Sequence, residues 1–325
     1  MRKNLIVAAC GVALAAGFSA CNKNNEPGYS YSETVNFGTY NIVTAEGQEP
    51  YVAPVRYQYN NRVDIAEQSQ TISMFINDMM LNKKEKVSIE TKALPYSSGQ
   101  YQIGDKYYPY IYMSDPYVAD DKDIQITDFT CILTYAAYQP SAEIPGYPVS
   151  VPKNDRYAGT ARENEYYTVM NYKIDNKWNV STFWPDVTFK GATATTYPGM
   201  EEPFTSDKIE YRVVLDLKTE GAPKANVFMI NAQFAPKAPM LMLALRNLPV
   251  TFHADGYSID VENVNPEQIE AGGFTENKAF PFDKFSLKFS ASSGRADIKY
   301  QVKTVFNGSF SGYYFYEMRE GADKN

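Results

Sequence analysis

The histidine and cysteine residues of this sequence are too few for most metal and nucleophile chemistry. The chain has one His, His253, and three Cys among 325 residues. Zinc and haem sites usually need several such ligands, so we expect no metal and no cofactor. His253 and Asp255 could orient a general base, but Asp255-Gly256 is a hairpin signal and no nucleophile motif accompanies it. We therefore interpret His253 as a polar turn residue.

Paired carboxylates are the remaining route to catalysis. Glu163/Glu165 and Glu201/Glu202 could supply the two acids, about 5–9 Å apart, that glycoside hydrolysis needs. However, the chain has 38 acidic residues, and nothing distinguishes these pairs from the others. We predict that the protein is not an enzyme, with a carboxylate-dependent glycan hydrolase as an alternative.

A cluster of aspartates precedes the apolar run that begins at Ile124. Carboxylate oxygens are the ligands that Ca²⁺ prefers, but the spacing of a calcium-binding loop is missing. We therefore interpret these residues as loop charges. The cluster consists of Asp115, Asp120, Asp121 and Asp123.

Aromatic residues offer binding chemistry. The chain has 27 Tyr and two Trp, Trp178 and Trp184. In the run 107–112, Tyr108, Tyr110 and Tyr112 alternate and would share one face of a strand. Rigid rings with a polar edge suit contact with a sugar or a protein partner. We predict that these five residues contact a ligand or a partner, although tyrosine is also common on ordinary strand faces.

The formal net charge of −7 excludes one class of partner. A protein that binds nucleic acid neutralises phosphates with a basic surface. We therefore expect no nucleic-acid partner.

The first twenty residues have the form of a secretory signal peptide. Arg2 and Lys3 are basic, and residues 5–17 are apolar. Thirteen residues are too short for a helix that crosses a hydrocarbon core about 30 Å thick, so the run predicts a cleaved signal.

The cleavage point carries a cysteine, Cys21. Ser19-Ala20-Cys21 resembles the lipobox of bacterial lipoproteins, and Phe18 at the preceding position resembles the looser lipoboxes of Bacteroidota. The resemblance implies lipid attachment at Cys21 and membrane anchoring through N-terminal acyl chains. It also implies an outer-membrane lipoprotein on the periplasmic or cell-surface face. Residues 21–30 are polar and read as a flexible tether.

The rest of the chain alternates apolar and polar residues with period two, which predicts an all-β fold. The sequence also matches itself. A shift of 154 positions places Tyr57 on Tyr211, Ile76-Asn77 on Ile230-Asn231, and Leu94-Pro95 on Leu248-Pro249. A shift of 156 places Tyr101 to Ile103 on Tyr257 to Ile259, and Cys131 on Leu287.

These matches predict two tandem, similar antiparallel β units, 31–174 and 175–325, each a sandwich or small barrel of about seven strands. One large β-sandwich built from both halves is the alternative. The turn signal at Asp175-Asn176 is expected to mark the boundary, the strand at 166–173 to match the final strand at 313–318, and residues 265–272 to form a short helix.

Three functions are consistent with this sequence. The first is a non-catalytic, membrane-anchored protein that binds a glycan or another small ligand. The second is an adhesin-like or accessory protein that contacts an outer-membrane protein partner, and the third is the glycan hydrolase. The overall likeness is to Bacteroidota outer-membrane lipoproteins of unassigned role, and it depends on the lipobox, the tether and the tyrosine-rich β character.

Overall fold

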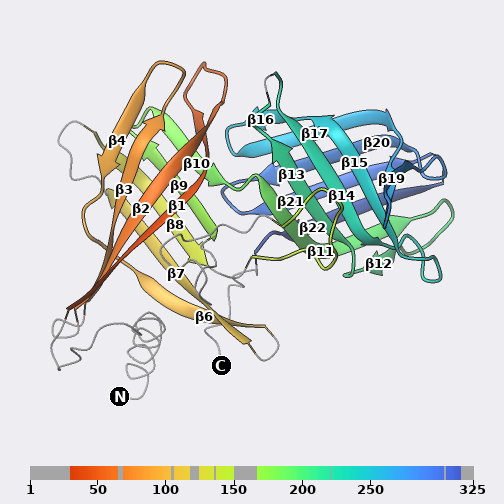
Figure 1. Ribbon diagram of the computed structural model, residues 1–325, viewed down its shortest axis with the longest axis horizontal. Coiled ribbons are helices and arrows are strands. Elements are labelled where there is room, and N and C mark those ends of the chain that lie inside the picture. The colour runs from red at the N-terminus through yellow and green to blue at the C-terminus, as the bar shows by residue number, and fades with distance from the viewer. Residues whose placement is uncertain are drawn as a thin grey trace. The chain divides into compact units, whose positions relative to one another are not determined.

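The computed structural model describes residues 30–64, 69–103, 106–117, 124–134, 137–149, 167–219, 221–303 and 305–315. Over these residues the chain is all-β, as predicted, and it forms two separate antiparallel sheets (Figure 1). The chain divides into two compact units, each built around one of the sheets.

Unit 1 contains a ten-stranded sheet in the order β4-β3-β2-β1-β10-β9-β8-β7-β6, with β5 paired to β3. The sheet curls, so that β5 approaches β7 from the other edge. Its strands are β1 (Ser30–Thr44), β2 (Tyr51–Asp64), β3 (Ser69–Met80), β4 (Lys86–Glu90), β5 (Leu94–Pro95), β6 (Ser97–Ile103), β7 (Lys106–Tyr117), β8 (Ile126–Thr134), β9 (Tyr167–Ile174) and β10 (Trp178–Phe183).

Unit 2 contains a twelve-stranded sheet in the order β16-β17-β20-β21-β22-β11-β13-β14-β15-β18-β19, with β12 paired to β11. This sheet also curls, and β15 approaches β17. Its strands are β11 (Asp186–Thr196), β12 (Phe204–Ser206), β13 (Glu210–Asp216), β14 (Lys224–Ala232), β15 (Leu241–Pro249), β16 (Thr251–His253), β17 (Gly256–Val264), β18 (Glu267–Glu270), β19 (Gly273–Glu276), β20 (Phe282–Ser290), β21 (Arg295–Val302) and β22 (Phe306–Tyr313).

The two sheets share one strand order. Each strand of the first sheet corresponds to one strand of the second when the two orders are compared position by position. The order in unit 1 is β4-β3-β2-β1-β10-β9-β8-β7-β6, and the corresponding order in unit 2 is β15-β14-β13-β11-β22-β21-β20-β17-β16. Each unit thus has nine corresponding strands, more than the seven or so expected from the sequence. The hairpin β18–β19 extends the sheet beyond β15, whereas β4 is the edge of the corresponding path in unit 1.

Strand register supports several of the sequence matches. Phe37 pairs with Tyr57 in unit 1, and Phe189 pairs with Tyr211 in unit 2. Likewise, Ile72 pairs with Leu94, while Ala225 pairs with Leu248. Because these pairs occupy equivalent ladders, Tyr57 corresponds to Tyr211 and Leu94 to Leu248, as the self-match predicts.

Two of the sequence matches were wrong. Tyr57 pairs with Ile76, but Tyr211 pairs with Met229, so Ile76 corresponds to Met229 and not to Ile230. Ile230 lies on the other face of β14, because a slip of one residue turns each side chain over. The match of residues 101–103 to 257–259 was also wrong, since it joins β6 to β17, whereas β17 corresponds to β7.

The predicted boundary after residue 174 was wrong as well. Asp175 and Asn176 have positive φ angles of 51° and 54° and form the hairpin turn between β9 and β10. Strand β10 completes the first sheet by lying between β9 and β1, so unit 1 extends to Thr182. The counterpart of β9 is therefore β21 and not the end of the chain, because β21 and β22 form the equivalent hairpin.

The short helix expected over 265–272 is the hairpin of β18 and β19. Asn265 and Pro266 resemble a helix start, but Gly272-Gly273 begins six residues after Pro266 and is a hairpin signal. Gly273 has a φ of 123°, a backbone conformation that residues with a side chain rarely adopt and that an α-helix does not contain.

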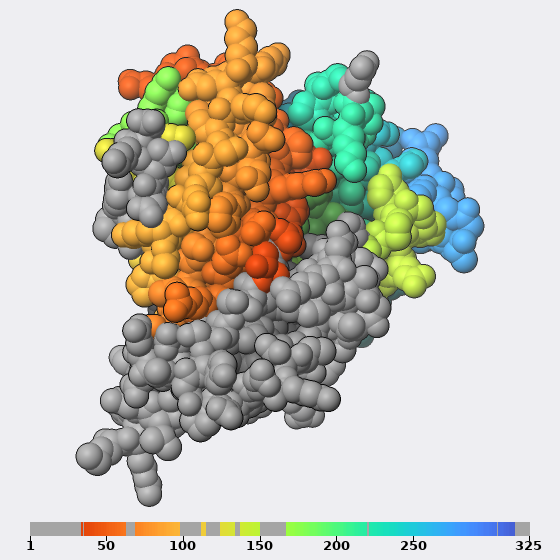
Figure 2. Space-filling view, turned by 60° about the vertical axis from the view of Figure 1, so that its left-hand side comes forward, coloured from red at the N-terminus to blue at the C-terminus, as the bar shows by residue number. Residues whose placement is uncertain are grey.

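Residues 137–149 follow β8 in sequence yet belong to unit 2. We call residues 137–149 the strap. The strap lies on the outer face of the sheet of unit 2, where Ile144 packs with Phe228, Ile230 and Ala244. In Figure 2 it is the yellow-green layer against the blue-green strands. Strands β14 and β15 are therefore buried on both faces, and their sequences are nearly continuously apolar.

Candidate functional site

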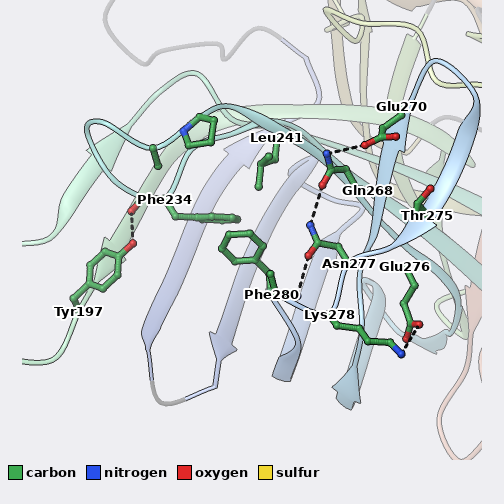
Figure 3. Close-up of a pocket in the computed structure, with 13 residues that line it drawn as sticks. Tyr197, Phe234, Leu241, Gln268, Glu270, Thr275, Glu276, Asn277, Lys278 and Phe280 are labelled. Atoms are coloured by element: carbon green, nitrogen blue, oxygen red, sulfur yellow. Dashed lines mark hydrogen bonds and ion pairs between the residues drawn. The ribbon is translucent and has the colours of Figure 1, made fainter.

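A pocket of about 490 Å³ opens in unit 2 between the hairpin β18–β19 and the chain near the ends of β11 and β14 (Figure 3). This volume is within the range of small-ligand sites. Its lining comes from four places in the sequence: Tyr197; residues Phe234, Ala238, Pro239 and Leu241; residues Gln268 and Glu270; and the run Thr275, Glu276, Asn277, Lys278, Ala279 and Phe280.

One side of the pocket is apolar and aromatic. The ring centroids of Phe234 and Phe280 lie 5.8 Å apart, and Leu241 points into the same space (Figure 3). Tyr197 donates a hydrogen bond of 3.2 Å from its hydroxyl to the carbonyl oxygen of Phe234. Partial burial raises the pKa of Tyr197, so the hydroxyl stays neutral at ordinary pH. Tyr197 and Phe280 are half-buried and offer ring surface to a ligand, whereas Phe234 is 3% exposed and belongs to the core.

The other side of the pocket carries a connected row of amides and carboxylates. Asn277 donates from its Nδ2 to Oε1 of Gln268 at 3.0 Å, and Gln268 donates from its Nε2 to Oε1 of Glu270 at 3.2 Å (Figure 3). Lys278 lies 3.5 Å from Glu276, a pair that is largely exposed. Each of these amide, carboxylate and ammonium groups is held by a hydrogen bond or an ion pair to another member of the row. The row therefore presents its donors and acceptors at fixed positions opposite the aromatic side.

The predicted tyrosine face lies in unit 1, away from this pocket. Tyr108, Tyr110 and Tyr112 are all in β7, and Tyr112 is 37% exposed. Tyr108 pairs with Tyr101, and Tyr110 pairs with Gly99, in the ladder between β6 and β7. The side chains of Tyr108 and Tyr110 lie outside the described residues.

The two tryptophans were wrongly assigned as contact residues. Trp178 is 3% exposed and Trp184 is 5% exposed, so both belong to the core. Lys177 covers the Trp178 ring, with its Nζ 4.5 Å from the ring centroid. Large rings bury more apolar area than any other side chain, and in this fold that area stabilises the sheet interior.

The other residues with possible chemistry do not converge. His253 is exposed beside the β16–β17 turn, with its Nε2 2.9 Å from Oγ of Ser258. Glu201 and Glu202 are exposed before β12. Within the described residues, no group of three or more His, Cys, Asp or Glu could hold a metal ion. Several predicted sites lie outside the described residues: Cys21, Glu163, Glu165, Asp120, Asp121 and Asp123.

Cys131 is a buried core residue. Its Sγ lies 3.6 Å from the Tyr59 hydroxyl, and burial raises the pKa of the thiol to about 12. The thiolate is the reactive form, so we expect Cys131 to resist iodoacetamide at pH 8 in the folded protein and to react once the protein unfolds in urea. Peptide mapping by mass spectrometry measures this labelling; rapid alkylation of Cys131 without urea would contradict the burial.

Sequence reasoning missed the pocket because its lining is dispersed over more than eighty residues. One signal was available: Gly272-Gly273 marks a hairpin, and its two arms carry Gln268, Glu270 and Glu276. Interpreting that segment as a helix concealed the row of polar groups.

Comparison of the chain with protein-family models, with curated proteins and with solved structures gives no match. The described part of the chain has no helix long and apolar enough to span a bilayer.

Proposed function

We propose that this protein is a lipoprotein anchored outside the cytoplasm through Cys21, and that unit 2 binds a glycan or a similarly polar small ligand. The pocket in Figure 3 carries this proposal, because it sets aromatic rings opposite a row of amides and carboxylates. Sugars have both apolar C–H faces and hydroxyl groups that donate and accept hydrogen bonds. A site with rings on one side and Gln268, Asn277 and Glu270 on the other matches both.

The anchor is supported by the sequence. Ser19-Ala20-Cys21 resembles a lipobox, and a polar tether follows it. Acyl chains each contribute about 0.8 kcal/mol per buried methylene, and more than one chain gives stable anchoring. A binding unit held near a bilayer in this way would capture ligand outside the cell or in the periplasm.

A glycan array tests the binding site. We expect the mature protein to bind at least one glycan class. We expect Gln268→Ala to weaken that binding about tenfold, since a hydrogen bond contributes about 0.5–1.5 kcal/mol and Asn277 and Glu270 lose the partner that aligns them. Isothermal titration calorimetry measures the change. Asn179→Ala removes an exposed amide from β10 in unit 1 and is the matched control. No glycan binding by the unmodified protein would overturn this part of the proposal.

One observation favours a second candidate, the glycan hydrolase. Glu270 and Glu276 line the same pocket from the two arms of one hairpin. Glycoside hydrolysis requires two carboxyl groups at the scissile bond. If the protein releases reducing ends from a bound polysaccharide, and Glu270→Gln or Glu276→Gln abolishes the release while binding persists, the protein is an enzyme.

A further inference from the structure

The strap contains a tight turn, Ile144-Pro145-Gly146-Tyr147, that brings two apolar side chains together. The amide N–H of Tyr147 donates to the carbonyl oxygen of Ile144 at 3.0 Å, and Gly146 has a φ of 75°. Proline at the second position and a glycine with positive φ at the third are the features of a type II turn. Because a β-turn brings its first and fourth residues close together, Ile144 and Tyr147 contact the same part of unit 2.

This turn packs against one face of the β18–β19 hairpin. Ile144 belongs to a buried cluster that includes Ile269 of β18 and Phe228 of β14. The ring centroid of Tyr147 lies 4.7 Å from that of Phe228 and 6.1 Å from that of Phe274 in β19, edge-on in both cases. Ile269 and Phe274 are paired across the hairpin, so their side chains share one face. The strap covers that face.

The opposite face of the hairpin lines the pocket. Side chains alternate along a strand, so Gln268 and Glu270 lie on the other side of β18 from Ile269. Thr275 pairs with Gln268 across the hairpin and shares its face. All three residues line the pocket (Figure 3). The hairpin therefore separates the strap from the row of amides and carboxylates.

The sheet holds this hairpin through few backbone pairs. Two residue pairs, Leu243 with Gln268 and Ala244 with Glu267, join β18 to β15. Among the described strands, β19 pairs only with β18. A two-stranded hairpin is at best marginally stable by itself, so the position of this hairpin depends largely on the side chains that pack against it.

Arg246 of β15 connects the sheet, the hairpin and the strap. Its guanidinium donates to Oε1 of Glu267 at 2.8 Å, and its Cζ lies 4.5 Å from the ring centroid of Phe274. The hydrogen bond to Glu267, and in addition one to Tyr147, raises the pKa of Arg246. The Phe274 ring thus contacts one side chain from β15 and one from the strap, which fixes β19 from both.

We propose that Ile144 and Tyr147 of the strap are positioning residues for the pocket, and that strap docking and glycan binding stabilise each other. The strap packs on one face of the hairpin and thereby fixes the row of amides and carboxylates on the other face. Coupling between two sites is reciprocal, so a bound glycan also holds the strap more tightly. The coupling to a glycan rests on the proposed function, whereas the positioning of the hairpin does not.

Hydrogen–deuterium exchange of the mature protein, without glycan, tests the positioning. Tyr147→Ala removes the ring from the strap. We expect the amides of residues 267–276 to exchange at least about fivefold faster in this variant, while those of β20 and β21 are unchanged. Tyr147→Phe keeps the ring and should restore the protection. Tyr51→Ala, which removes a half-buried ring from β2 in unit 1, is the matched control.

Unchanged exchange of the hairpin in Tyr147→Ala would overturn the proposal. Equal acceleration in β20 and β21 would also overturn it, because the ring would then support unit 2 as a whole. The side-chain amide NMR signals of Gln268 and Asn277 report on the row directly. We expect these signals to shift in Tyr147→Ala and to return in Tyr147→Phe, and unchanged signals would contradict the positioning of the row.

The glycan array, repeated with the same variants, tests the coupling. We expect Tyr147→Ala to bind the glycans of the unmodified protein at least about fivefold more weakly, and Tyr147→Phe to bind them normally. Normal glycan binding by Tyr147→Ala would overturn the coupling. An unmodified protein that binds no glycan would overturn the proposed function and the coupling together, and hydrogen exchange would still decide whether the strap positions the hairpin.

Discussion

Replacing Arg212 with alanine is expected to lower the free energy of unfolding of unit 2 by about 3–5 kcal/mol, because it breaks a buried ion pair from one side. Arg212 is 1% exposed, and its guanidinium donates to both carboxylate oxygens of Asp186, at 2.9 and 2.7 Å. It also donates to the carbonyl oxygens of Tyr147 and Pro148 in the strap, at 2.8 and 2.9 Å. The variant leaves a carboxylate and two carbonyls without their donors.

Urea denaturation measures this loss, and proteolysis reports its location. Since Arg212 joins the strap to β13, we expect proteases to cut residues 137–149 faster in the variant. Arg295→Ala is the matched control, because Arg295 pairs with Asp297 at 2.9 Å on an exposed surface, where such pairs contribute at most about 1 kcal/mol. Equal stability losses in the two variants would contradict the role of the buried pair.

Replacing Cys21 with alanine is expected to abolish lipid attachment and to move the protein from the membrane fraction to the soluble fraction. The physical reason is that the acyl chains supply the membrane affinity. Incorporation of radiolabelled palmitate, followed by fractionation, measures both effects in the producing cell.

Cys10→Ala is the control, because Val7-Ala8-Ala9-Cys10 is the other lipobox-like stretch in the chain. That variant should keep the label and the membrane location. A Cys21→Ala protein that still carries palmitate, or an unmodified protein that carries none, would remove the anchor from the proposed function without affecting the fold or the pocket.

Strand equivalences were predictable from the sequence where no bulge intervenes. Alternation along a strand has a period of two, so Tyr57 and Tyr211 were correctly matched from their neighbours alone. In β3 and β14, Asp78 and Asn231 adopt positive φ angles of 50° and 56° at equivalent bulges. An extra residue at a bulge shifts the alternation of apolar and polar residues by one position. The match of Ile76 to Ile230, which lies next to the bulge, was therefore wrong by one residue.

The extent of unit 1 was not predictable from local signals. Asp175-Asn176 is a genuine turn, but a turn inside a hairpin and a turn between units have the same residues. Only the pairing of β10 with β1, which are more than 130 residues apart, shows that this turn lies inside unit 1. For the same reason Trp178, which was expected on a surface, is a core residue.

The sequence by itself determined the all-β class, the use of two similar units and the candidate anchor at Cys21, because each depends on periodicity or on a short contiguous motif. The tertiary structure alone decided the pocket and the strap. Each of these depends on which distant segments meet, as when Tyr197, Phe234 and Phe280 line one space. The packing of the whole sheet determines which distant segments come together, and no local pattern of residues encodes that.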